Sequence, residues 1–165
     1  MVLAAPLNAC DALKRHNESE QAAAPGTPVQ VLEDPARVHE AGEQAEARDF
    51  VMSYAETAQC QVEQHLRPRP GWAKLGVRVT LKGTSEREVP VNPFYASLEA
   101  KNGNAYETTL AGCRPQLRAQ RVAEGRAASG WITFDVPEGV REFVLSYRPT
   151  VIGSAPQEVK FRLSL

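Results

Sequence analysis

The residues Trp72–Lys82, WAKLGVRVTLK, decide the class of fold. Large apolar side chains occupy every second position, namely Leu75, Val77, Val79 and Leu81. The positions between and beside them hold polar or small residues, namely Lys74, Gly76, Arg78, Thr80 and Lys82. This period of two residues predicts a β-strand with one face buried and the other face in water.

Other segments on both sides of this strand alternate in the same way or are rich in β-branched and aromatic residues. They are Val29–Val31, Phe50–Ala55, Val91–Ala100, Ala105–Leu110, Trp131–Val136, Glu142–Tyr147 and Val159–Leu165. Turn sequences separate them, and Asn102-Gly103 is the strongest short hairpin signal. About eight short strands with frequent turns predict an all-β fold, an antiparallel β-sandwich.

The segment Ala36–Arg48 is rich in Ala, Glu and Gln, which leaves a helical turn or an irregular loop open. We expect a loop followed by a strand.

The N-terminal part differs from the rest of the chain. Residues 1–50 carry four basic and nine acidic side chains, whereas residues 51–165 carry a net charge of +4. The segment Asp11–Pro28 has one large apolar residue, too little to offset the entropy lost on ordering. We therefore expect residues 1–28 to be a signal remnant and flexible tether, and residues 29–165 to be the sandwich domain. A short surface helix over Ala12–Ala24 is the alternative.

The overall composition excludes several classes of protein. The 165 residues are 42% hydrophobic and 24% charged, as in globular domains. The net charge of −1 argues against a nucleic-acid binder that relies on a basic field. No apolar run approaches the roughly 20 residues that a membrane-spanning helix needs.

Three segments follow one another in a recognisable order, namely Gly71–Leu81, Val91–Leu98 and Ser129–Pro137. With them the chain resembles, from about Gly42 to Leu165, a bacterial family of telokin-like domains of unknown function. The resemblance implies an immunoglobulin-like β-sandwich, related to a secreted bacterial antigen and often attached to a lipoprotein signal by a linker. It implies no catalytic residue.

The most specific part of the resemblance is Gly130–Pro137, whose residues are those of a core strand and a turn. Ile132 and Phe134 share a face, and we expect both in the core. Trp131 and Phe134 are three positions apart and cannot share a face of a regular strand, which predicts Trp131 at the surface or rim.

Cys60 and Cys113 both lie within the expected sandwich, and we expect a disulfide between them. It would close a loop of about 54 residues and stabilise the domain by at most roughly 4 kcal/mol. Such a bond is typical of an oxidising compartment. Two unpaired thiols in the cytosol are the alternative, and no C-x-x-C motif suggests redox activity.

Cys10 follows Leu7-Asn8-Ala9, which is similar to a bacterial lipobox. The polar tether after it is typical of a lipoprotein, although no basic region precedes it and Met1–Leu7 is short for an apolar signal core. We expect lipidation of Cys10, membrane attachment through it and an extracytoplasmic location. If the signal is not real, Cys10 is a free thiol and the protein is cytoplasmic.

The chain contains little that suggests catalysis. His16, His39 and His65 are far apart and form no metal-binding motif with the cysteines. No Gly-rich phosphate loop or G-x-S-x-G elbow is present. We therefore expect a protein that is not an enzyme and that has no metal and no cofactor.

Basic residues gather at Arg114, Arg118, Arg121 and Arg126, between two expected strands. A solvated loop is the plain interpretation. We expect instead a surface for a protein partner in the cell envelope or in a larger assembly, on the loop Arg114–Ser129. The sequence thus predicts a non-catalytic binding or scaffolding module. A small protease or hydrolase inhibitor and a cytoplasmic accessory subunit are the alternatives.

Overall fold

Two long antiparallel strands, β4 (Trp72–Gly83) and β9 (Ala127–Pro137), form the centre of the fold in the computed structural model, which describes residues 37–165. They pair from Trp72 opposite Pro137 to Lys82 opposite Ala127. The predicted alternation in β4 is confirmed, because all four of its apolar residues from Leu75 to Leu81 are buried. Ile132 and Phe134 in β9 are fully buried, as predicted, while Trp131 is only partly buried.

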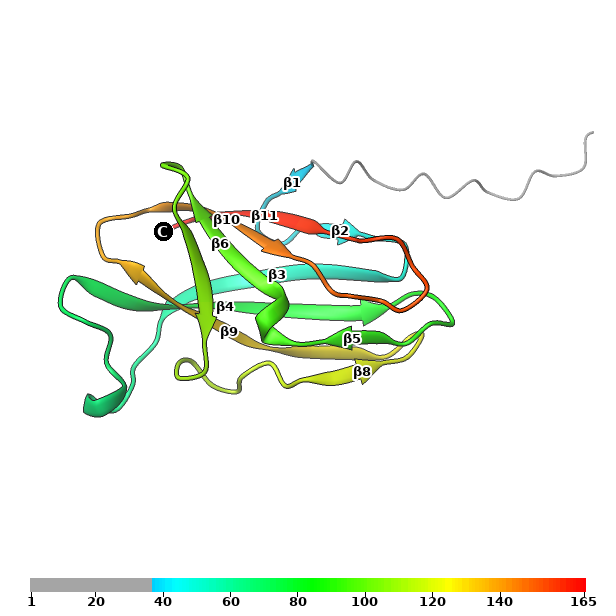
Figure 1. Ribbon diagram of the computed structural model, residues 1–165, viewed down its shortest axis with the longest axis horizontal. Helices are drawn as coiled ribbons and strands as arrows, with labels where there is room; N and C mark the ends of the chain where they lie inside the picture. Colours follow the sequence, from blue (N-terminus) through cyan, green and yellow to red (C-terminus); the bar gives the residue numbers. More distant parts are fainter. Residues whose placement is uncertain (1–36) are drawn as a thin grey trace, which may run out of the picture. The chain divides into compact units, whose positions relative to one another are not determined.

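The strands form two facing layers (Figure 1). In one layer β9 and β4 continue into β3 (Phe50–Gln59) and β2 (Gln44–Glu46). In the other layer lie β6 (Ala96–Ala100), β10 (Glu142–Tyr147), β11 (Val159–Ser164) and β1 (Val38–His39). A separate two-stranded ribbon pairs β5 (Val89–Val91) with β8 (Gln120–Val122).

Strand β7 (Ala105–Thr109) joins the layers along one side. Its first residues pair with β6, where Tyr106 lies opposite Leu98, and its last residues pair with β9, where Thr108 lies opposite Phe134. All strand pairs within the layers are antiparallel except β1 with β11. The fold is an immunoglobulin-like antiparallel β-sandwich, as predicted.

The core lies between the layers and is rich in aromatic rings. Phe50 and Tyr95 each contact Tyr147 edge to face, and Phe161 contacts Tyr54 in the same way. The Tyr147 hydroxyl donates to the Asn92 carbonyl at 3.2 Å, and burial raises the pKa of Tyr147 to about 12. Buried aromatic side chains with satisfied polar ends are a main source of stability in a sandwich of this size.

The predicted strand Val91–Ala100 is wrong in its middle, where the chain turns through the short 3₁₀ helix η2 (Pro93–Tyr95). Asn92 caps this turn, because its side-chain oxygen accepts from the Phe94 N–H at 3.0 Å. The turn leaves Phe94 55% exposed. A second 3₁₀ turn, η1 (Gln64–Leu66), follows β3.

Residues 37–48 form β1, β2 and the turns beside them, which agrees with the loop and strand expected for this segment. The predicted strand at Val29–Val31, the tether and its boundary at residue 28 lie outside the described residues. Among residues 37–165, no helix is long and apolar enough to cross a membrane.

Candidate functional site

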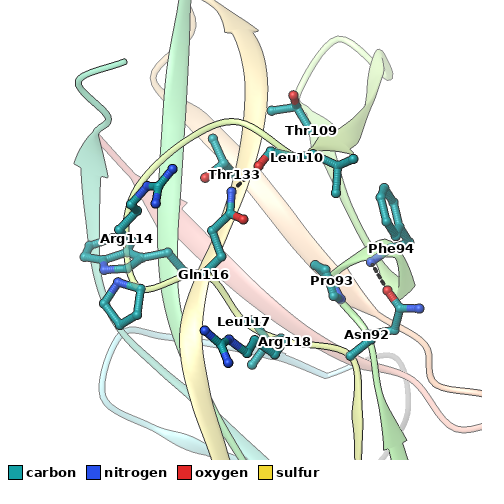
Figure 2. Close-up of a pocket in the computed structure, with 13 residues that line it drawn as sticks. Asn92, Pro93, Phe94, Thr109, Leu110, Arg114, Gln116, Leu117, Arg118 and Thr133 are labelled. Atoms are coloured by element: carbon teal, nitrogen blue, oxygen red, sulfur yellow. Dashed lines mark hydrogen bonds between the residues drawn. The ribbon is translucent and has the colours of Figure 1, made fainter. Parts of the chain in front are cut away.

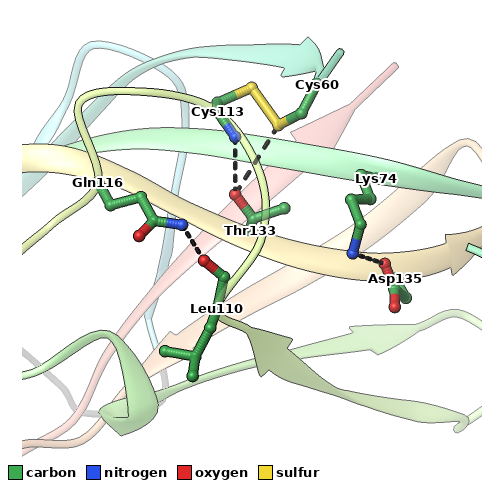
Figure 3. Close-up of a disulfide and its surroundings, with 7 residues drawn as sticks. All are labelled: Cys60, Lys74, Leu110, Cys113, Gln116, Thr133 and Asp135. Atoms are coloured by element: carbon green, nitrogen blue, oxygen red, sulfur yellow. Dashed lines mark hydrogen bonds and ion pairs between the residues drawn. A yellow bond between two sulfur atoms is a disulfide. The ribbon is translucent and has the colours of Figure 1, made fainter. Parts of the chain in front are cut away.

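A disulfide joins Cys60, just after β3, to Cys113, in the loop between β7 and β8 (Figure 3). The two residues are 53 positions apart in sequence, and their Cα atoms are 4.8 Å apart. The bond holds Cys113 against the outer face of the β4–β9 pair, over Gly76. Residues 111–119 are called here the clamped loop. Gly76 of β4 lies beneath it, and a Cβ there would come within 2.8 Å of both sulfur atoms.

The structure corrects the expectation for the outer face of β4. Arg78, Thr80 and Lys82 are exposed, as predicted, but Lys74 and Gly76 are buried. The Lys74 ammonium lies 2.8 Å from the Asp135 carboxylate and 3.4 Å from the Thr109 hydroxyl. A buried ammonium needs such partners because burial removes its water.

Thr133 of β9 is the second attachment point of the clamped loop. Its side chain is buried, and its hydroxyl oxygen accepts from the Cys113 N–H at 3.3 Å (Figure 3). Gly112 packs so closely that any Cβ there would overlap the Thr133 side chain. The chain can cross β9 at this point only with glycine at position 112.

The third attachment is a short parallel pairing with β9. The Trp131 N–H donates to the Pro115 carbonyl at 2.9 Å, and the Leu117 N–H donates to the Trp131 carbonyl at 2.9 Å. Leu117 is buried, and the Gln116 side-chain amide donates to the Leu110 carbonyl, which ties the clamped loop to the residue that follows β7 (Figure 3). The backbone of the clamped loop is therefore held against β9 at Cys113, Pro115 and Leu117.

An open cleft of about 720 Å³ lies between the clamped loop and η2 (Figure 2). Pro93, Phe94 and Leu110 form one side, called here the apolar lip, and Leu110 is 69% exposed. Side chains of the clamped loop and Trp131 form the other side. A volume of this size is ordinary for a binding site, and Phe94 and Leu110 are both large apolar side chains that stay exposed at its rim.

The charge of the cleft is positive. Arg114 and Arg118 line it, both are exposed, and no Asp or Glu is among its lining residues. Within residues 37–165 neither guanidinium forms an ion pair. Two unpaired guanidinium groups beside an apolar lip favour a ligand that combines carboxylates with apolar side chains.

The other residues of the predicted partner surface lie elsewhere. Arg121 is in β8, opposite Pro90, and lines a different pocket together with Arg87. Arg126 follows Gly125 in the turn before β9. The structure thus brings Arg114 and Arg118 to one cleft but not Arg121 and Arg126. Cys10, the predicted lipidation site, lies outside the described residues.

Sequence reasoning missed a buried carboxylate at the opposite end of β3, Asp49, which joins three loops. Its carboxylate accepts from the hydroxyls of Ser85 and Ser154, and from the side-chain amide of Gln157. Burial, the largest influence, raises the pKa of Asp49, but these hydrogen bonds and the charge of Arg87 outweigh it and lower the pKa below 3.8. The partners are far from Asp49 in sequence, so no local motif predicts this cluster.

The histidines within the described residues do not form a shared site. His39 is buried against the ring of Phe161, and His65 is exposed beside Glu63. Among residues 37–165, no group of three His, Cys, Asp or Glu side chains is placed to hold a metal ion.

Solved structures share this fold. YcdA of Bacillus subtilis, described as a candidate lipoprotein, aligns with a TM-score of 0.63 and 15% identity over 73% of this chain. YjhA of the same organism aligns with a TM-score of 0.58 and 16% identity over 75% of this chain and 99% of its own. MPT63, a secreted protein of Mycobacterium tuberculosis, aligns with a TM-score of 0.50 and 13% identity over 79% and 99% of the two chains.

These likenesses establish the fold. Of the three proteins, YcdA is described as a candidate lipoprotein and MPT63 as a secreted protein. The alignment covers only 38% of YcdA, so this chain corresponds to less than half of that protein. No curated protein matches the chain significantly. A family model described as "Domain of unknown function (DUF4352)" matches residues 39–158. The chain therefore belongs to the DUF4352 family, which is the kind of sandwich family that its sequence resembles.

Proposed function

We propose that this domain is a non-catalytic binding module that acts outside the cytoplasm and holds a protein partner on the loop Arg114–Ser129. The observation that carries the proposal is the pair of exposed guanidinium groups, Arg114 and Arg118, on a loop that a disulfide and three hydrogen bonds of its backbone hold against β9. Rigid loops lose little entropy on binding, and unpaired arginines are strong partners for carboxylates.

The proposed location has separate support. The Cys60–Cys113 disulfide is of the kind that persists in oxidising compartments, and two proteins of the same fold are described as secreted or as a lipoprotein. The sequence Leu7-Asn8-Ala9-Cys10 supports the further proposal of a lipid anchor at Cys10.

Intact mass of the protein from the organism that makes it tests the location. A chain that begins at Cys10 with added acyl mass, and no alkylatable thiol before reduction, is the expected result. Three alkylatable thiols on an unprocessed chain would overturn both the anchor and the extracytoplasmic location.

Cross-linking in living cells tests the binding role. The full chain is compared with a triple variant, Arg114→Glu, Arg118→Glu and Arg121→Glu, and with a control that reverses three exposed charges elsewhere, Arg67→Glu, Lys101→Glu and Arg141→Glu. We expect a defined partner to be cross-linked by the wild type and the control but not by the triple variant. Equal cross-linking by all three proteins would remove the loop from the proposal.

A further inference from the structure

We propose that the cleft between the clamped loop and η2 binds an extended peptide in which acidic and apolar residues alternate. This inference rests on the proposed function and names the chemistry of the partner segment. The cleft is lined by Arg114 and Arg118 on one side and by the apolar lip on the other (Figure 2).

The backbone at Gln116 supplies the first argument for an extended peptide. In a parallel pairing, one residue forms both hydrogen bonds, and the bonds go to the residues before and after the one that lies opposite it. The opposite residue therefore directs its own N–H and C=O away from the strand with which it is paired. Trp131 bonds to Pro115 and Leu117, so the backbone polar groups of Gln116, which lies opposite Trp131, point away from β9. No residue of the range 37–165 hydrogen-bonds to them. A strand edge of this kind is completed by another extended chain.

The side chains around this edge supply the second argument. Leu117 is buried, and side chains alternate along an extended segment, so Gln116 and Arg118 on either side of it face outward. A peptide that pairs with this edge also alternates its side chains. One set then faces the guanidinium groups of the clamped loop, and the other set faces the lip formed by Phe94 and Leu110.

Charge supplies the third argument. The lining residues carry two guanidinium groups and no carboxylate, and both guanidinium groups are exposed and lack a partner among residues 37–165. A peptide with carboxylates gains charge-assisted hydrogen bonds to them, whereas a basic peptide is repelled. The headgroup of an anionic lipid would also pair with the guanidinium groups. A lipid has no extended backbone to hydrogen-bond with the N–H and C=O of Gln116, however, and this favours the peptide.

Selection from a displayed library of random octapeptides tests the inference with the full chain as bait. We expect the wild type to enrich peptides with acidic residues at alternate positions and Leu, Ile, Val or Phe between them. The bait variant Arg114→Gln/Arg118→Gln should lose this enrichment. The control bait Arg67→Gln/Arg141→Gln, which loses the same charge at exposed sites outside the cleft, should retain it.

A synthetic copy of the enriched consensus then gives the affinity by fluorescence anisotropy. We expect each Arg→Gln change to weaken binding about tenfold, as a charge-assisted contact requires. Methylation of the peptide nitrogen that pairs with the Gln116 carbonyl should weaken binding, whereas methylation of the next nitrogen should not. Binding should weaken steeply in about 1 M salt, where the Debye length is about 3 Å.

Three results would overturn the inference: no enrichment, enrichment without acidic residues, and equal enrichment by the Arg114→Gln/Arg118→Gln bait. Binding of the chain to vesicles of anionic phospholipid through the same arginines, without peptide enrichment, would also overturn it in favour of a lipid surface. If cross-linking in cells still depends on Arg114 and Arg118 in any of these cases, the proposed binding role stands while the peptide chemistry falls.

Discussion

Gly130 of β9 lies directly beneath the backbone of Leu117, so closely that a Cβ on Gly130 would lie 2.5 Å from the Leu117 nitrogen. The same Leu117 nitrogen donates to the carbonyl of Trp131, the next residue of β9. The absence of a side chain at position 130 is therefore what allows the clamped loop to pair with the sheet.

Replacing Gly130 by Ala should force the clamped loop off β9. Backbone atoms cannot yield as a flexible side chain can, so we expect a loss of about 1–3 kcal/mol in the free energy of unfolding. Denaturant unfolding measures it. Gly139→Ala is the matched control, because a Cβ at Gly139 meets nothing within 4 Å and should change stability little. Equal stability of the two variants would show that this contact does not hold the loop.

Removing the disulfide should cost stability and open the clamped loop. Replacing Cys60 and Cys113 together by Ala should lower the free energy of unfolding by up to roughly 4 kcal/mol for a loop of this length. Reductant should destabilise the wild type to a similar degree and leave the double variant unchanged. Limited proteolysis should cleave near Arg114 or Arg118 faster in the variant. A reductant-insensitive wild type would argue against the bond.

Stability at low pH should depend on Asp49. Its pKa is lowered in the folded state from 3.8, so the folded state favours the ionised carboxylate. The resulting stability is fully present above about pH 4 and is lost as the pH falls through the lower, folded-state pKa. Unfolding followed between neutral pH and acid should therefore show a decline that begins below about pH 4.

The variant Asp49→Asn separates this effect from general acid unfolding. An amide accepts fewer of the hydrogen bonds that Ser85, Ser154 and Gln157 donate, so we expect a loss of about 1–3 kcal/mol at neutral pH. The variant should also show a shallower decline of stability in acid. The same acid profile in both proteins would mean that other carboxyl groups dominate.

The layers of the fold could be predicted because a strand with one buried face repeats every two residues. This rule places Leu75, Val77, Ile132 and Phe134 in the core without any knowledge of topology. The break at η2 has a local sequence signal, since Asn92 as a cap and Pro93 in the first turn are typical of a short helical turn.

The cleft could not be predicted, because its sides come from separate parts of the chain. Phe94 lies in η2 and Leu110 directly after β7, so only the folded chain brings both to the same cleft. Arg118 lies on the other side of the cleft because of the path that the clamped loop takes along β9. Clustering in sequence suggested that Arg121 and Arg126 belong with Arg114. The start of β8 instead carries Arg121 toward the β5 ribbon. Loop positions of this kind are set by tertiary contacts rather than by local pattern.

The same limit applies to Lys74, whose burial leads to the last prediction. Lys74 and Asp135 lie directly opposite each other in β4 and β9, and Arg78 and Glu56 lie directly opposite each other in β4 and β3. The two ion pairs have similar distances, 2.8 Å and 3.0 Å, but Lys74 is 4% exposed whereas Arg78 and Glu56 are each 52% exposed.

Double-mutant cycles on the two pairs should therefore differ. Asp135→Asn leaves the Lys74 ammonium buried without a carboxylate, and we expect a loss of about 1–3 kcal/mol, reduced from the fully buried case because Asp135 is 41% exposed. Lys74→Met, which removes the buried charge, should cost less, and the double variant should recover most of the loss. The Arg78–Glu56 cycle should give a coupling below about 1 kcal/mol. Equal coupling in the two cycles would mean that burial of Lys74 does not strengthen its ion pair, and that water reaches the ammonium beside the clamped loop.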